Sequence, residues 1–321
     1  MYKGNILDVE GIKVGQVEDK EALTGCTVVI CEKGAVCGVD IRGSAPGTRE
    51  TDLLNPINLV DKVHAVVLSG GSAFGLDASS GVMKYLEENN IGFDVGVTKV
   101  PIVASAVLFD LHVGNYKIRP DFDMGYKACK QASDQILNQG NYGAGCGATC
   151  GKINGTEYAT KTGIGSYSIK LENGLVVAAL VAANPFGDIY EDGKIIAGAL
   201  DFDKKNFINT YEQMKKKEKL NGFSINNTTI GIVATNAKIN KAEATKVSQM
   251  AHNGYAKAIL PIHTMYDGDT IFTIATGKIE CDISLLGTMA AEAVQKSIIN
   301  AVKNSESVKG IPSYKDIFKN V

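Results

Sequence analysis

Short apolar runs rich in β-branched residues recur along the chain and predict buried strands. The run at residues 230–234 is too short for an ordinary helix, and its composition favours a strand inside the core. Similar runs at residues 27–31, 35–41 and 63–68 predict three further strands. The longest run, residues 175–183, predicts another, and it falls well short of the roughly 18 apolar residues that suggest a membrane-spanning helix.

Helical periodicity alternates with these runs only irregularly. Asn240 and Glu243 have the spacing of a capping box and predict a helix that ends near residue 254. Weaker patterns predict helices at residues 76–87, with Ser72 as the N-cap before them, and at residues 124–138. The last helix carries an i+4 apolar series, formed by Leu286, Ala290, Val294, Ile298 and Val302. Helices with one apolar stripe cover sheet faces, so we expect a layered α/β sandwich rather than a doubly wound fold.

Composition narrows the classes of partner and compartment. The 321 residues are 45% hydrophobic and carry a net charge of −2, which argues against a nucleic acid or an anionic membrane as the main partner. The first ten residues lack an apolar signal segment, and the seven cysteines have no regular spacing. We therefore expect a reducing, cytoplasmic location without a disulfide framework.

Residues 188–222 are polar and charged, and they include the basic run at residues 215–219. Because no aromatic residues interleave with the charges of this basic run, a solvated linker is a better interpretation than a nucleic-acid site. This linker would deliver the chain to Thr228, directly before the apolar run at residues 230–234. A hydroxyl at that point can cap the strand, or it can be a nucleophile that the strand holds rigidly.

Glycine-rich residues 143–152 invite comparison with a phosphate-binding loop, but the spacing does not match that motif, and Ile153 follows the lysine. Cys146 and Cys150 have no partnering His or Cys pair nearby, so no metal site is expected, and no cofactor is expected either. His252 and His263 are not at a helical ligand spacing and are interpreted as structural or solvated.

The remaining candidate groups are each open to a second interpretation. Asp267 and Asp269 precede a predicted strand at residues 270–275 and can point to one side of a sheet, although aspartates are also common in turns. Asn184, which precedes a proline, is open to interpretation as a turn residue, and Lys152 as a solvated side chain. Taken singly, none of them establishes a site.

Taken together, these motifs resemble a known family. The segments that carry the resemblance are residues 68–76, 143–152, 184–185, 227–236, 261–264 and 267–270. In this order and over residues 8–303, they resemble the self-cleaving N-terminal nucleophile hydrolases, which include nylon-oligomer (aminohexanoate-oligomer) hydrolase, D-aminopeptidase/esterase and β-aminopeptidases. The Asn-Thr pair and the two aspartates are most similar to the nylon-hydrolase branch.

The resemblance implies an αββα sandwich made as one domain over residues 1–321 and cut between Asn227 and Thr228. Residues 1–227 and 228–321 would then be the large and small chains, with Thr228 as the nucleophile. Asp267, Asp269, Lys152 and Asn184 match the family's other site residues. A tyrosine of the nylon hydrolase corresponds to Phe109 here, so the ring is retained and the phenol is lost.

These groups have a chemical logic within the family mechanism. A threonine hydroxyl needs a base beside it, and cleavage before Thr228 would free an α-amino group whose pKa in model compounds is about 7.7–8.0. Asn184 is a candidate oxyanion donor, and the aspartates would orient the ammonium and hydroxyl groups of Thr228. Gly70, Gly71 and Ser72 either shape the substrate pocket or only begin a helix.

We therefore expect a cytoplasmic, self-processing hydrolase of amide bonds in peptides or short oligoamides, without a cofactor. The family resemblance also implies a homo-oligomer. Two alternatives remain open at this point: an acyltransferase of the ornithine acetyltransferase type, whose surrounding motif is missing here, and a self-cleaved binding protein without turnover.

Overall fold

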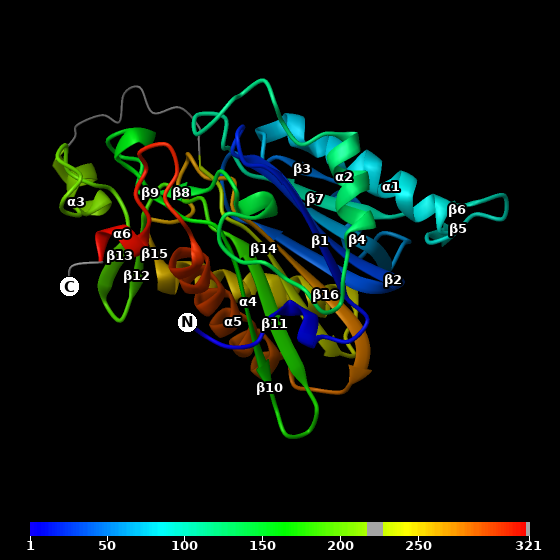
Figure 1. Cartoon of the computed structure of the whole chain (residues 1–321). Coiled ribbons are helices and arrows are strands. Elements are labelled where there is room, and N and C mark those ends of the chain that lie inside the picture. Colours follow the sequence, from blue (N-terminus) through cyan, green and yellow to red (C-terminus); the bar gives the residue numbers. More distant parts are fainter. Residues whose placement is uncertain (217–226, 319–321) are drawn as a thin grey trace.

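The computed structural model describes residues 1–216 and 227–318 and has four layers, with two sheet layers between two pairs of helices (Figure 1). Within the described residues, nine strands form one continuous hydrogen-bonded sheet that folds over, so that its two halves face each other. The predicted layered α/β sandwich is confirmed.

One half of the sheet holds the strand that follows Thr228. Its hydrogen-bonded neighbours, in order, are β10 (Ile164–Lys170), β11 (Val176–Ala182), β14 (Ile230–Ala237) and β16 (Thr270–Ile279). The β14 and β16 strands run parallel, with Ile230 paired to Thr270, while β10–β11 and β11–β14 are antiparallel. Parallel neighbours begin at the same sheet edge, so the residues just before β14 and β16 lie together.

The long strand β2 (Thr24–Ile41) joins the two halves. Its first part pairs with β1 (Lys13–Asp19) and β4 (Lys62–Ser69), and its last part pairs with β16. The two separate strands expected at residues 27–31 and 35–41 are therefore wrong. The exposed residues between them do not break the strand, because β2 continues through a register shift against β4 between Ile30 and Ala35.

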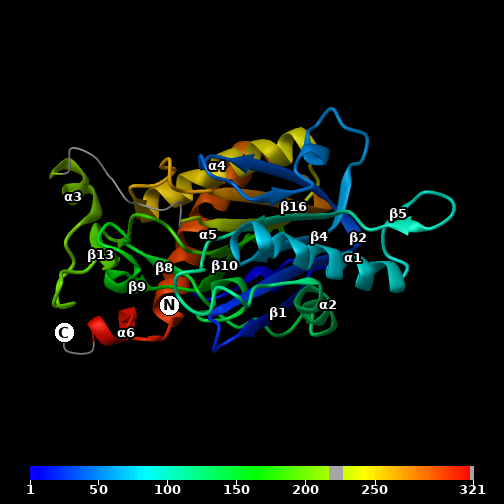
Figure 2. The ribbon, with the colours of Figure 1, turned by 90° about the horizontal axis from the view of Figure 1, so that it is seen from above.

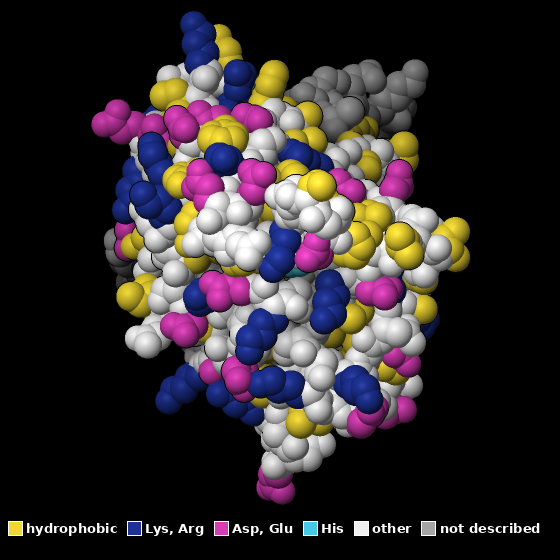
Figure 3. Space-filling model, turned by 90° about the vertical axis from the view of Figure 1, so that its right-hand side faces the viewer, with side chains coloured by type: hydrophobic (Ala, Val, Ile, Leu, Met, Phe, Trp, Pro, Cys, Tyr) yellow, Lys and Arg dark blue, Asp and Glu magenta, His cyan; other side chains and the backbone are white. Residues whose placement is uncertain are grey.

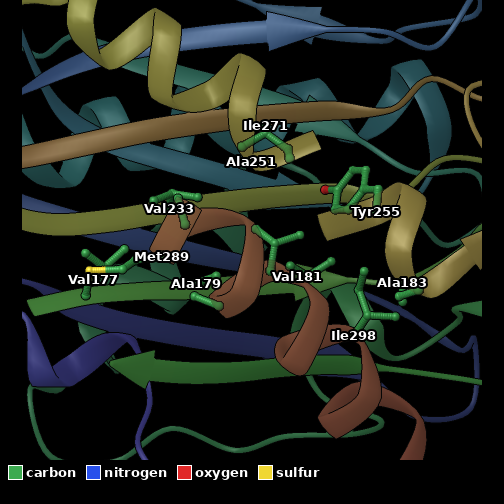
Figure 4. Packing of buried hydrophobic residues seen from close by; sticks show 14 of the residues in the cluster. Val177, Ala179, Val181, Ala183, Val233, Ala251, Tyr255, Ile271, Met289 and Ile298 are labelled. Carbon is green, nitrogen blue, oxygen red and sulfur yellow. The ribbon is translucent and has the colours of Figure 1, made fainter. Parts of the chain in front are cut away.

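Four helices cover the outer faces of the sandwich. Helices α4 (Lys241–Ala258) and α5 (Ile283–Asn304) pack on the half that contains β11 and β14, whereas α1 (Ala78–Glu88) and α2 (Phe122–Lys130) pack on the other (Figure 2). The predicted capping box is confirmed at α4, since Asn240 and Glu243 exchange both hydrogen bonds. Side chains of α4 and α5 interlock with Val177, Ala179 and Val181 of β11 and with Ala183 just after it (Figure 4).

Two local predictions in this region are wrong. The Ser72 side chain caps no helix, because Gly71, at φ +80°, is the N-cap of a short 3-10 helix, Ser72–Asp77, that leads into α1. Helix α2 ends at Lys130 rather than residue 138. The backbone of Ser133 instead pairs with Val14 at the edge of β1, which leaves Ile136 exposed.

The polar segment expected as a linker is partly structured. It contains β12 (Asp188–Glu191), β13 (Lys194–Ala197) and α3 (Thr210–Lys216), while its last residues, from 217 on, lie outside the described part of the chain. The buried Asp188 carboxylate explains this order, since it accepts hydrogen bonds from the backbone of Ala199 and from the backbone and hydroxyl of Thr210. Polar composition therefore did not mean a solvated segment.

The remaining elements are short. They are β3 (Thr48–Arg49), β5 (Phe93–Asp94), β6 (Lys99–Val100), β7 (Val103–Val107), β8 (Thr149–Cys150), β9 (Thr160–Lys161), β15 (Ile259–Leu260) and α6 (Tyr314–Ile317). On the face seen in Figure 3, basic and acidic side chains are interspersed rather than separated by sign. No helix in residues 1–216 or 227–318 combines the length and the apolar character needed to cross a membrane.

The interior between the two sheet halves should dominate the stability of the fold. Ile232, on β14, is fully buried there, so Ile232→Ala should lower the free energy of unfolding by about 2–5 kcal/mol. Ile57 is 88% exposed and is the control, for which we expect a change within about 0.5 kcal/mol. Urea denaturation measures both, and equal losses for the two variants would contradict this packing.

Candidate active site

Thr228 lies where the chain enters β14, in the buried corner formed with β16. The residue before it, Asn227, forms a parallel bridge with Asp267, and the backbone N–H of Thr228 donates to the carbonyl oxygen of Asn184 at 2.9 Å. The side chain donates from Oγ1 to the carbonyl oxygen of Asn227. Thr228 is only 4% exposed, so its hydroxyl is held against the preceding peptide bond with little access to water.

A cavity of about 120 Å³ opens beside this hydroxyl. Its lining consists of Ala45, Pro46, Gly47, Ser72, Ala73, Val107, Leu108, Phe109, Asn227 and Thr228. Phe109 and Ser72 are therefore brought together with Thr228 at one small, uncharged pocket. Of the described residues, Gly70 and Gly71 lie outside this lining: they sit against Asp110, whose carboxylate accepts from the Gly71 N–H at 2.7 Å.

The two aspartates of the turn before β16 are both fully buried, and their carboxylates accept from different sets of donors. Asp267 accepts from the N–H of Phe186 at 3.2 Å and from the N–H and hydroxyl of Thr264. Asp269 accepts from the N–H of Thr229, the residue after Thr228, at 2.8 Å. The carboxylates thus fix the backbone at Phe186, at Thr264 and at Thr229, directly after the threonine.

Gly268, between these aspartates, has no side chain and so leaves space for the Thr228 hydroxyl. A Cβ added at Gly268 would lie 2.9 Å from Thr228 Oγ1 and 2.5 Å from the carbonyl oxygen of Ala45. Any larger residue would push against both groups, so the close approach requires glycine.

Lys152 and Asn184 form a hydrogen-bonded group that also includes the backbone N–H of Thr228. The Lys152 ammonium donates to the side-chain oxygen of Asn184 at 2.8 Å and to its carbonyl oxygen, the one that also binds the Thr228 N–H, at 3.0 Å. The Asn184 amide nitrogen donates to the carbonyl oxygen of Phe109 at 2.9 Å. Asn184 therefore links the lysine, the threonine and the wall of the cavity.

Burial changes the protonation of this cluster. It lowers the pKa of Lys152 to about 7, although the nearby Asp267 charge opposes that shift. Burial, with the neighbouring Asp269 charge second, raises the pKa of Asp267 to about 7. Both groups are therefore able to gain or lose a proton near neutral pH, which is what proton transfer at a site requires.

The structure adds His263 and Thr264, which the sequence interpretation left out of the site. Thr264 holds Asp267, and the His263 ring nitrogen Nδ1 lies 2.8 Å from Asp269. The spacing of His263 from His252 matches no helical ligand pair, so that spacing points to no site. A signal was present in its position in the loop just before the two aspartates.

Other groups considered at the sequence level have structural surroundings. Burial raises the pKa of the Cys146 thiol to about 11 and that of Cys150 well above its usual value, so neither is a thiolate. All seven cysteines are unpaired. In the part of the chain that the structure describes, no cluster of three or more His, Cys, Asp or Glu side chains is arranged to hold a metal ion.

The sequence profile of peptidase family S58 matches residues 4–315 of this chain. An uncharacterised aminopeptidase of Mycobacterium leprae (strain TN) is 38% identical over 351 residues, covering 98% of this chain and 94% of the relative. The 6-aminohexanoate-oligomer endohydrolase of Kocuria sp. (strain KY2) is 28% identical over 313 residues, covering 92% of this chain and 85% of that protein.

Solved structures share the fold. A β-aminopeptidase of Burkholderia sp. superposes with a TM-score of 0.71 at 20% identity, covering 99% of this chain and 94% of the other. The L-aminopeptidase D-Ala-esterase/amidase of Ochrobactrum anthropi gives 0.72 at 16% identity, with 96% and 88% covered, and is described as a variant of the Ntn hydrolase fold. The predicted αββα sandwich of N-terminal nucleophile type is thus confirmed.

The raised pKa of Asp267 should appear in the pH dependence of stability. A carboxyl with a raised folded-state pKa favours folding most below its unfolded value, 3.8, and this contribution is lost as pH rises toward 7. Relative to Asp267→Asn, the wild type should therefore lose unfolding free energy between about pH 4 and pH 8. Urea denaturation across this range measures the difference, with the exposed Asp61→Asn as control. A difference that is flat or rises with pH would contradict the buried setting of Asp267.

Proposed function

This chain belongs to peptidase family S58, and on that premise we propose that it cuts itself before Thr228 and then uses this residue as its nucleophile. Membership of a peptidase family makes hydrolysis of amide bonds its reaction class. The chain would mature into residues 1–227 and 228–321, which stay together because β14 is buried between β11 and β16.

One observation carries the proposal: the Thr228 hydroxyl contacts the carbonyl group of its own preceding residue, Asn227, at the edge of the cavity. In self-cleavage, Thr228 Oγ loses its proton to a base and bonds to the Asn227 carbonyl carbon. The bond from that carbon to the Thr228 nitrogen breaks, and the nitrogen takes a proton. Water then cleaves the resulting ester, which leaves Asn227 with a carboxylate and restores the hydroxyl of Thr228 with a free amine.

Lys152 is the candidate base for the first step. Its lowered pKa, about 7, leaves a substantial neutral fraction at physiological pH, which an ordinary lysine lacks. It converges with the Thr228 N–H on the carbonyl oxygen of Asn184, so it belongs to the same hydrogen-bonded cluster. Asp267, whose pKa is raised to about 7, is a second group that can exchange a proton there.

After cleavage the nucleophile has its own base. The free α-amine of Thr228 titrates in model compounds at about 7.7–8.0, so its neutral form can accept the Oγ proton when a substrate carbonyl is attacked. Turnover should then fall as pH drops below the folded-state pKa of this amine. Asp267 and Asp269 hold the loops around the amine and the hydroxyl, and Lys152 and backbone N–H groups are donors for the developing oxyanion.

Asn184 has a narrower part in this scheme than the family resemblance implies. Its amide nitrogen already donates to the carbonyl oxygen of Phe109, and its side-chain oxygen accepts from Lys152 and from the N–H of Thr149 at 3.0 Å. Asn184 therefore orients its neighbours first, and its contacts with the described residues leave one amide hydrogen for an oxyanion.

The cavity indicates the class of substrate. None of the described residues that line it carries a charge, and its volume of about 120 Å³ admits a small side chain or a short methylene segment. The names of the relatives, aminopeptidase and aminohexanoate-oligomer hydrolase, agree with a peptide or short oligoamide whose acyl part enters this pocket.

The enzyme is proposed to act as a homo-oligomer, and the exposed Phe93, Val95 and Val97 of the β5–β6 hairpin are available for subunit contact.

The nucleophile is tested by two matched valine variants. Val keeps the shape of threonine and removes only its hydroxyl, so Thr228→Val should abolish self-cleavage. Thr229→Val should leave it largely intact, because the buried Thr229 hydroxyl has no hydrogen-bond partner among the described residues. Denaturing gels and N-terminal sequencing over time after cell-free synthesis measure both. Cleavage of the Thr228 variant at the wild-type rate, or of neither protein, would overturn the proposal.

Phe109 provides a second test, on the cavity wall. Phe109 and Thr228 both line this cavity, and the Phe109 ring lies 5.2 Å from the His112 ring, centroid to centroid. Phe109→Tyr adds a donor there and should raise turnover of aminohexanoate oligomers by about 2- to 12-fold, the effect of one hydrogen bond worth roughly 0.5–1.5 kcal/mol.

Kinetics of amide hydrolysis across pH measure this effect, with the exposed Phe202→Tyr as control. Should neither the rate nor the pH profile move, Phe109 acts only in packing.

A further inference from the structure

His263 makes two contacts with one oxygen of Asp269. Its backbone N–H donates to Oδ2 at 3.1 Å, and its ring nitrogen Nδ1 lies 2.8 Å from the same atom. A carboxylate oxygen accepts hydrogen bonds, so Nδ1 carries the proton and donates it. The residue has φ +57°, a left-handed conformation that lets both nitrogens face the carboxylate.

The surroundings keep this ring in place. The His252 ring packs against it at a centroid distance of 4.8 Å and bonds through Nε2 to the carbonyl oxygen of Asp40 at 3.1 Å. Burial lowers the pKa of His252 to about 4, so this neighbour stays neutral. The His263 Nε2 is buried and makes no hydrogen bond within the described residues, which leaves Asp269 as the ring's polar anchor.

The second oxygen of Asp269 leads directly to the nucleophile. Asp269 Oδ1 accepts from the Thr229 N–H at 2.8 Å, and this N–H belongs to the peptide unit that joins Thr228 to Thr229. The hydrogen bonds from His263 to Oδ2 therefore set the rotation of the carboxylate, and its other oxygen sets the position of the peptide unit. Within residues 1–216 and 227–318, the hydrogen-bond donors to Asp267 are Phe186 and Thr264, neither of which is titratable.

We propose that His263 is a positioning residue: through Asp269 it holds the Thr228–Thr229 peptide unit so that the Thr228 hydroxyl faces the carbonyl to be attacked. The inference rests on the proposed function, because it assigns His263 a part in orienting that nucleophile. His263 itself is not among the described residues that line the cavity. Its loss should slow the chemical step and leave substrate binding nearly unchanged.

The left-handed backbone allows a clean pair of variants. Glycine and asparagine both tolerate φ +57°, so neither strains the loop. His263→Gly removes the side-chain donor, whereas His263→Asn keeps a neutral N–H donor close to the position of Nδ1. His64→Asn makes the same chemical change at a buried histidine far from Thr228, where the ring accepts from the N–H of Ile102.

Self-cleavage after cell-free synthesis is the first readout, because it needs no added substrate. His263→Gly should slow cleavage by about 10- to 150-fold, the range that loss of one hydrogen bond to a charged group gives. His263→Asn and His64→Asn should stay near the wild-type rate. On matured protein with β-alanyl p-nitroanilide as the probe, the glycine variant should lose kcat and keep its KM.

Thr228→Val separates the two hypotheses. If it blocks cleavage while His263→Gly and His263→Asn cleave equally, at whatever rate, the role of His263 is overturned and the proposed function stands. If Thr228→Val still cleaves, the proposed function fails, and the role of His263 fails with it. Thermal unfolding of each variant completes the design. The inference is contradicted if His263→Gly cleaves slowly and also shows a large fall in Tm, while His263→Asn does not restore cleavage. That result indicates a structural role for His263.

Discussion

The structure depends on one constraint: the carboxylates of Asp267 and Asp269 are buried beside the buried hydroxyl of Thr228. Removing a carboxylate from water costs several kcal/mol unless hydrogen bonds replace the lost hydration. Here Asp267 and Asp269 each accept from several N–H or O–H groups, some from the adjoining loop at His263 and Thr264 and some from the distant residues Phe186 and Thr229. The same contacts that make the burial tolerable therefore assemble the site.

The sheet supplies the geometry for this assembly. Because β14 and β16 are parallel neighbours, the residues before them emerge at one edge, where Thr228 meets Gly268. Lys152 and Asn184 come from the segments before and after β10 and β11 and close the cluster from the other side. The low dielectric of this corner shifts the pKa values of Lys152 and Asp267 toward neutrality, so the packing that forms the fold also prepares the proton transfers.

The layered fold followed from the sequence because strand and helix periodicity are local signals, whereas the grouping of Thr228 with the two aspartates was implied only by the family resemblance. The sequence interpretation missed His263, whose contact with Asp269 depends on a left-handed loop conformation that no periodicity encodes. It also divided β2 in two and took the segment around Asp188 for a linker. In both places long-range hydrogen bonds, rather than local composition, order the backbone.

The most direct test of the account is to locate the acyl group during turnover. The purified protein would be mixed briefly with the p-nitrophenyl ester of a short amino acid, quenched in acid, digested and analysed by mass spectrometry. The account predicts a peptide that begins with Thr228, has a free amine, and carries the acyl group on the hydroxyl of Thr228. An intact bond between Asn227 and Thr228 in an active protein, or an acyl group on another residue, would contradict it.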